Sequence, residues 1–149
     1  MKKILYIDMD GVIVDFDSGI SALNEEEREL YKNNYAQCPS IFSRMKPIPQ
    51  AIDCVHELSE IFDVYILSSP SWGNASAWSD KYEWIEEYIP SMERKLILSS
   101  QKHLNRGDYI IDDRLHNGVS QFQGEHIHFG TSDFPDWDSV MRYLKNKAE

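Results

Sequence analysis

The stretch Leu5–Phe16 reads LYIDMDGVIVDF, and two carboxylates follow its short apolar run. The run Leu5–Ile7 predicts a buried strand, so Asp8 and Asp10 would stand where the chain leaves the sheet. Two carboxylates this close repel each other, and they need a cation, a shared proton or nearby basic side chains to compensate. The alternative interpretation is a helix-capping Asp followed by a turn Asp.

Length, charge and cysteine content limit the class of protein. A chain of 149 residues is one domain by length. Its net charge of -10 argues against a nucleic-acid polymer as partner, but it allows a small anion bound with a divalent metal. Cys38 and Cys54 have no metal-ligand or redox spacing and predict unpaired thiols in a reducing compartment. The apolar run before Asp8 is too short for a signal peptide or membrane span, which predicts a cytoplasmic protein with no membrane partner.

Apolar runs that predict strands alternate with helical periodicity along the chain. The predicted strands are residues 4–7, 64–67, 96–98, 109–111 and 126–129. The predicted helices cover residues 52–62, 78–89 and 137–144. This alternation predicts an α/β fold, a three-layer Rossmann-like parallel sheet with right-handed crossovers. Ligands bind at the carboxyl ends of the strands in such a sheet.

Residues 17–45 do not fit the alternation, and we interpret them as a small helical cap inserted after the first strand of a single domain, 1–149. The segment contains the acidic run NEEEREL (24–30), which is interpreted as the solvated face of a helix in preference to a metal cluster. It returns to the main domain through KPIP (46–49), where two prolines mark the boundary. An insertion at this point would lie above the carboxylates as a lid.

Polar residues follow the other predicted strands as well. Ser68 and Ser69 follow the second strand; their hydroxyl and backbone N–H groups suit phosphate, although Ser-Ser-Pro is also a common turn. Lys102 follows the third strand, and a lone lysine more often lies on the solvated surface. Asp112 and Asp113 form a second acidic pair after the fourth strand.

A strand order of 3-2-1-4-5 would bring these residues together, because it places the first strand between the second and the fourth. Asp8, Asp10, Ser68 and Asp112 would then converge. Oxygen ligands with room left for water and a substrate oxygen suit Mg²⁺. The H-x-H pair at 126–128 alternates with apolar residues inside a predicted strand, so we assign it a structural role.

Four ordered motifs resemble those of the haloacid dehalogenase superfamily of phosphotransferases. They are DMDGV (8–12), SSP (68–70), Lys102 and IIDDR (110–114). Within this superfamily the chain resembles the 5'(3')-deoxyribonucleotidases, the pyrimidine type of cytosol and mitochondria. That likeness is carried by DMDGVIVDF (8–16), ILSSP (66–70), KYEWIEEY (81–88) and YIIDDR (109–114).

The resemblance implies a magnesium-dependent phosphomonoesterase that dephosphorylates deoxynucleoside monophosphates through an aspartyl phosphate. It implies that Asp8 is the nucleophile and that Asp10 is the general acid and then the base. Phosphate oxygens would be held by Ser68, Ser69 and Lys102. The metal would be held by oxygen ligands: the Asp8 carboxylate, the Asp10 backbone carbonyl, and Asp112 or its neighbour Asp113.

The resemblance is weakest in the substrate pocket. Phe16 matches a family aromatic that lines the nucleoside pocket, whereas Phe42 is the nearest equivalent of the aromatic base contacts in the larger cap of the vertebrate enzymes. The cap of this chain has only about thirty residues. Another small phosphomonoester therefore remains the alternative substrate.

Two other classes of protein share part of this residue pattern. A phosphorylation-dependent receiver module also uses Asp pairs, a Ser or Thr, a Lys and magnesium, but its phosphorylated Asp follows the third strand, where this chain has SSQKH (99–103). A catalytically idle binding protein on the same fold would have no need of the second carboxylate, Asp10.

Overall fold

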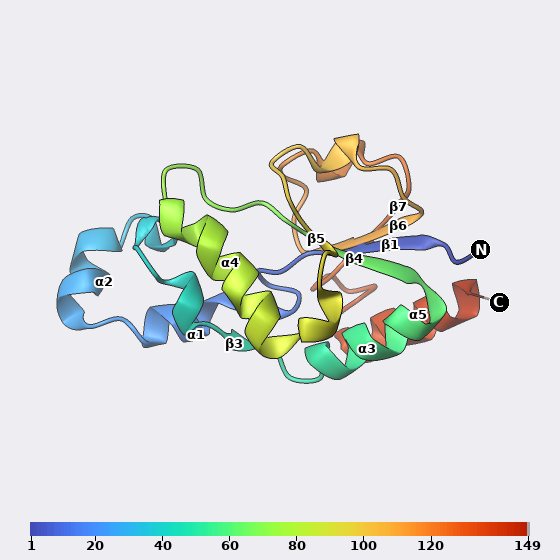
Figure 1. Ribbon diagram of the computed structural model, residues 1–149, viewed down its shortest axis with the longest axis horizontal. Helices are drawn as coiled ribbons and strands as arrows, with labels where there is room; N and C mark the ends of the chain where they lie inside the picture. The colour runs from blue at the N-terminus through green and yellow to red at the C-terminus, as the bar shows by residue number, and fades with distance from the viewer. Residues whose placement is uncertain (149) are drawn as a thin grey trace.

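The computed structural model describes residues 1–148 and is built on five parallel strands (Figure 1). They are β1 (Ile4–Ile7), β4 (Asp63–Ser68), β5 (Leu96–Leu98), β6 (Tyr109–Asp112) and β7 (Glu125–His128). Their order in the sheet is β5-β4-β1-β6-β7, so β1 is central, between β4 and β6. Both the five predicted strands and the predicted order, 3-2-1-4-5, are confirmed.

Helices pack on one face of the sheet. They are α3 (Ala51–Ile61), α4 (Ala75–Tyr88) and α5 (Trp137–Lys147), and the short 3₁₀ turn η3 (Pro90–Met92) follows α4. Side chains alternate along a strand, so Leu5 and Ile7 of β1 point into the larger core between the sheet and these helices. Tyr6 belongs to a smaller core on the opposite face of the sheet. Figure 1 shows α3 and α5 together beneath the sheet.

The opposite face of the sheet has a thinner cover than a three-layer fold usually has. It consists of loops with two 3₁₀ turns, η4 (Lys102–Leu104) and η5 (Val119–Gln121). The connections at 99–108 and 113–124 are too short for a full helix with its turns, and the small core there is closed by Val119 and Phe122. The short connections keep both loops close to the strand ends.

The segment after β1 begins and ends in a small antiparallel ribbon, β2 (Val14–Asp15) paired with β3 (Lys46–Pro47). Two-residue strands carry no periodicity, so this ribbon could not be predicted from the sequence. Between its strands lie α1 (Phe16–Ser21), α2 (Glu25–Tyr31), η1 (Tyr35–Gln37) and η2 (Phe42–Arg44). None of the residues of α2 is buried, which confirms that the acidic run is a solvated helix face.

Hydrogen bonds attach residues 34–45 to the start of α4. The side-chain amide of Asn74 donates to the carbonyls of Ala36 (2.8 Å) and Cys38 (3.1 Å), and the backbone N–H of Ser40 donates to Ser76 Oγ (2.8 Å). In Figure 1, α1 and α2 accordingly lie at the end of the molecule opposite the N-terminus. The inserted segment therefore lies beyond the carboxyl ends of the strands.

Cys38 and Cys54 are both buried free thiols. Within residues 1–148, no helix combines the length and the apolar character needed to cross a membrane.

Candidate active site

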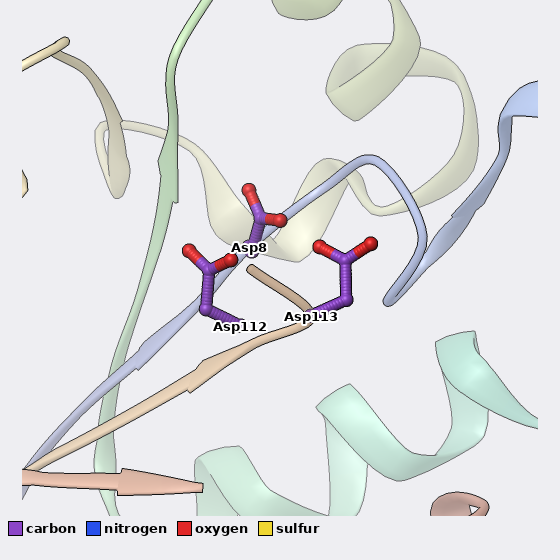
Figure 2. Close-up of side chains that lie close together, drawn as sticks. All are labelled: Asp8, Asp112 and Asp113. Atoms are coloured by element: carbon purple, nitrogen blue, oxygen red, sulfur yellow. The ribbon is translucent and has the colours of Figure 1, made fainter. Parts of the chain in front are cut away.

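Three aspartates meet at the carboxyl ends of β1 and β6. Asp8 directly follows β1, Asp112 is the last residue of β6, and Asp113 comes next. One carboxylate oxygen from each lies within 4.8 Å of the other two. Figure 2 shows the three side chains extending to the same side of the strand ends. The cluster therefore concentrates negative charge at the place where a parallel sheet binds ligands.

A buried lysine lies against this cluster. Lys102 Nζ donates to Asp8 Oδ1 (2.9 Å) and to Asp112 Oδ2 (2.7 Å), and the side chain of Lys102 is only 3% exposed. Burial opposes the charge on Lys102, but the two carboxylates outweigh burial and raise its pKa. The interpretation of Lys102 as a surface lysine is therefore wrong, and its ammonium pairs with two of the three carboxylates of the cluster.

The negative charge of the three carboxylates is only partly compensated by Lys102. Burial raises the pKa of Asp8 to about 6, since Lys102 offsets only part of the desolvation. Burial, followed by the charge of Asp8, raises the pKa of Asp113 to about 6, and burial also raises the pKa of Asp112. Such a cluster favours an added cation. Its hard oxygen donors are those that Mg²⁺ prefers, so the residues fit this ion.

Gly11 allows the cluster to close. Its φ is +80°, and a Cβ at this position would lie 2.1 Å from Asp113 Oδ2. A side chain here would therefore be strained and would also displace the carboxylate. The glycine of the DMDGV motif is thus explained by the close approach of Asp113 to the turn after β1.

Two histidines of β7 support the backbone of the acidic pair. His126 Nε2 is hydrogen-bonded to the carbonyl of Asp112 (2.9 Å), and His128 Nε2 to that of Asp113 (3.0 Å). The rings stack with centroids 4.8 Å apart, and burial lowers the pKa of His126. A carbonyl oxygen can only accept, so Nε2 of each ring must carry a proton and donate it. The pair therefore has the structural role assigned from the sequence.

Asp10 lies beside a buried lysine that the sequence analysis missed. Lys81 Nζ donates to Asp10 Oδ2 (2.9 Å), and its side chain is 1% exposed. The same ammonium lies 4.5 Å from the ring centroid of Phe42, so it joins Asp10 to the inserted segment. Oδ1 of Asp10 is buried and has no hydrogen-bond partner among the described residues.

A signal for Lys81 was present in the helical periodicity. Lys81 occupies the same stripe of α4 as the buried residues Ala77, Trp84 and Ile85. A lysine at a core position of an amphipathic helix is costly unless it is paired, so its position predicts a buried acidic partner. The identity of that partner, 71 residues earlier in the chain, depends on the tertiary fold.

The two serines after β4 differ in their surroundings. Ser68 is 1% exposed, and its hydroxyl finds no hydrogen-bond partner within residues 1–148. The hydroxyl of Ser69 donates to the carbonyl of Ser99 (2.6 Å), which leaves its remaining surface to line the cavity described next. A buried hydroxyl without a partner is costly, so Ser68 is suited to meet a ligand oxygen.

A cavity of about 580 Å³ opens above the cluster. Its lining includes all of the predicted site residues except Ser68: Asp8, Asp10, Phe16, Phe42, Ser69, Lys102, Asp112 and Asp113. Phe16 and Phe42 pack edge to face with ring centroids 5.8 Å apart. The volume lies within the range of small-molecule sites.

Comparisons with known proteins identify the family. The family described as "5' nucleotidase, deoxy (Pyrimidine), cytosolic type C protein" matches residues 18–143. The chain belongs to this family. This chain is 50% identical over 147 residues to a protein of Vibrio phage KVP40 named "Putative 5'(3')-deoxyribonucleotidase", covering 98% of this chain and 86% of the phage protein. It is 28% identical to the human cytosolic 5'(3')-deoxyribonucleotidase, over 72% of this chain and 69% of the human one.

A solved structure supports the fold of this chain. A Burkholderia xenovorans protein described as a "putative haloacid dehalogenase-like hydrolase" superposes with a TM-score of 0.52 at 11% identity, covering 94% of this chain and 88% of that one. The chain is therefore a phosphoric monoester hydrolase of haloacid dehalogenase-like fold. The resemblance drawn from the motifs is confirmed, and the receiver-module and idle-binding interpretations are wrong.

Proposed function

We propose that this protein is a magnesium-dependent enzyme that hydrolyses deoxynucleoside monophosphates through an aspartyl phosphate on Asp8. The observation that carries the proposal is the buried Asp8 carboxylate, held through Oδ1 by Lys102 and facing a cavity of about 580 Å³. A cavity of this size suits a nucleotide. The alternative substrate is another small phosphomonoester, because the inserted segment is short.

The first half-reaction transfers the phosphoryl group to the enzyme. An oxygen of Asp8 attacks phosphorus, and the ester bond to the sugar oxygen breaks. Asp10 gives its proton to that leaving oxygen. Lys102 and the hydroxyl of Ser68 hold phosphate oxygens, and the charge of Lys102 lessens the repulsion between the phosphate and Asp8.

The second half-reaction frees the enzyme. Asp10, now a carboxylate, takes a proton from water as the water attacks phosphorus, and the bond between phosphorus and Asp8 breaks. Inorganic phosphate leaves, and Asp10 carries the proton that the next turnover needs. Lys81 holds Asp10 through Oδ2 in both steps, which makes Lys81 a positioning residue.

Magnesium would be held by Asp8, by the backbone carbonyl of Asp10, and by Asp112 or Asp113. Bound there, it would neutralise charge on the phosphate and the carboxylates. The proposal is supported by the close packing of three carboxylates, of which Lys102 pairs with Asp8 and Asp112.

A phosphatase assay tests substrate and metal together. We expect hydrolysis of deoxynucleoside monophosphates with Mg²⁺, and loss of activity in excess chelator that added Mg²⁺ restores. The panel contains the eight common ribo- and deoxyribonucleoside monophosphates together with 2-deoxyribose 5-phosphate. Faster hydrolysis of the sugar phosphate than of every nucleotide would favour the alternative substrate. Full turnover in chelator would contradict the metal assignment.

The stability of the metal-free protein should depend on pH in a defined direction. Asp8 and Asp113 have pKa values raised to about 6 in the folded state, above the ordinary 3.8 of the unfolded chain. Folding therefore favours their protonated forms, so stability is greatest at low pH and is lost as pH rises through about 6. We expect the metal-free Tm to fall by roughly 3 °C between pH 5 and pH 7.5 from this source.

Magnesium should reverse that loss. Scanning calorimetry with and without Mg²⁺ is the measurement, and Mg²⁺ should raise Tm more at pH 7.5 than at pH 5. Asp113→Asn removes one of the repelling carboxylates, so it should reduce both the pH dependence and the magnesium effect. An equal magnesium effect at both pH values would mean that the ion binds away from this cluster.

A further inference from the structure

One aromatic side chain at the cavity is left largely exposed by the fold. Trp72, in the loop between β4 and α4, lines the cavity and is 83% exposed. Tryptophan is highly buried on average, because leaving its large ring in water forgoes a substantial hydrophobic gain. Of the four tryptophans, Trp84 and Trp137 lie in the core, and Trp78 on α4 is 37% exposed and is not part of the cavity lining.

The backbone beneath this ring is fixed. Gln37 Nε2 donates to the carbonyl of Trp72 (2.9 Å), which ties the loop to η1. Gly73 follows with φ +92°, and a Cβ there would meet Gln37 Oε1 at 3.2 Å. The turn therefore holds Trp72 at the rim of the cavity while its indole stays free. A fixed backbone reduces the ordering cost of binding a flat ligand there.

The phenylalanines and the tyrosine that line the cavity are already engaged. Phe42 is 3% exposed and packs against both Phe16 and the Lys81 ammonium. Tyr35 packs against the main core. Among the phenylalanine, tyrosine and tryptophan side chains of the lining, Trp72 thus has the faces most open to a ligand.

We propose that the indole of Trp72 is the stacking platform for the nucleobase and makes the enzyme prefer nucleotides to sugar phosphates. The inference rests on the proposed function, and it assigns the base contact to the core loop after β4 instead of the inserted segment. Every base has a π-face, so a stacking platform accepts purines and pyrimidines alike. Specificity among bases would need hydrogen bonds in addition.

Kinetics on two kinds of substrate tests the proposal. Trp72→Ala should raise KM for thymidine and deoxyadenosine 5'-monophosphates about tenfold, with kcat within about twofold, because stacking is lost without moving the reacting groups. The rate on 2-deoxyribose 5-phosphate, which has no base, should not change. Trp72→Phe should retain most of the affinity. Trp78→Ala is the matched control and should behave as wild type on both substrates.

The proposal would be overturned if Trp72→Ala lost activity on both the nucleotides and 2-deoxyribose 5-phosphate, or on neither. A binding measurement separates its failure from that of the proposed function. In a Trp78→Phe background, thymidine or deoxyadenosine without phosphate should quench the exposed tryptophan fluorescence, and Trp72→Phe should abolish that quenching. Quenching that persists in Trp72→Phe would also overturn it. Quenching that depends on Trp72 in a protein without phosphatase activity would support the platform and contradict the proposed reaction.

Discussion

Asp8→Asn is expected to lower kcat for nucleotide hydrolysis by roughly 10⁴-fold or more, since it removes the proposed nucleophile. The amide has nearly the shape of the carboxylate, and it can still accept a hydrogen bond from Lys102. Rapid-quench experiments with substrate labelled on phosphorus should find no phosphoprotein in this variant, whereas the wild-type enzyme should carry acid-stable, hydroxylamine-sensitive label during turnover.

A loss of activity in Asp8→Asn through lost chemistry must be distinguished from a loss through misfolding. Asp8 is buried beside Asp112 and Asp113, so replacing its charge relieves repulsion and should not lower the Tm of the metal-free protein. Asp53→Asn, on the exposed side of α3, is the matched control and should keep wild-type activity. Phosphoprotein labelling of folded Asp8→Asn would contradict the assignment of the nucleophile.

The sheet and its acidic edge were predictable from the sequence because their signals are local. Buried parallel strands appear in the sequence as short apolar runs. The polar residues that directly follow each run lie at the carboxyl end of that strand. With the order 3-2-1-4-5, the convergence of Asp8 and Asp112 follows from β1 lying between β4 and β6. Gly11 was predictable as a turn residue, but its contact with Asp113 was not.

The parts that could not be predicted depend on long-range packing. Lys102 looks like a surface lysine in the sequence, and only the fold of η4 over the sheet edge buries it between two carboxylates. The pairing of Lys81 with Asp10 likewise joins α4 to the turn after β1. The β2–β3 ribbon pairs residues more than thirty apart, through strands too short to show a pattern.

Asp10→Asn should separate the two half-reactions, because Asp10 is proposed to donate a proton in the first and accept one in the second. Asparagine can do neither. With a nucleotide, whose sugar alkoxide leaves poorly without a proton, the variant should stall before phosphoryl transfer and lose about 10²- to 10⁴-fold in rate. With 4-nitrophenyl phosphate, whose phenolate leaves unprotonated, the first step should be partly rescued while hydrolysis of the aspartyl phosphate stays slow.

The expected result with 4-nitrophenyl phosphate is a burst of about one equivalent of phenolate per active site, followed by slow turnover. Stopped-flow absorbance measures the burst, and phosphoprotein should accumulate on Asp8 in parallel. If Asp10→Asn hydrolysed nucleotides at the wild-type rate, Asp10 would have no role in either half-reaction.

Lys81→Met tests whether the buried ammonium acts through Asp10. The substitution leaves the Asp10 carboxyl group in place, but it removes the hydrogen bond to Asp10 Oδ2 and the cation beside the Phe42 ring. The loss of rate should therefore be smaller than in Asp10→Asn. If Lys81 only positions Asp10, adding Lys81→Met to Asp10→Asn should cost little further activity, because the two changes disrupt one interaction. A double variant that loses the full product of the two single effects would mean that Lys81 serves the reaction independently of Asp10. The coupling between the two changes thus distinguishes a positioning lysine from a second source of charge at the phosphate.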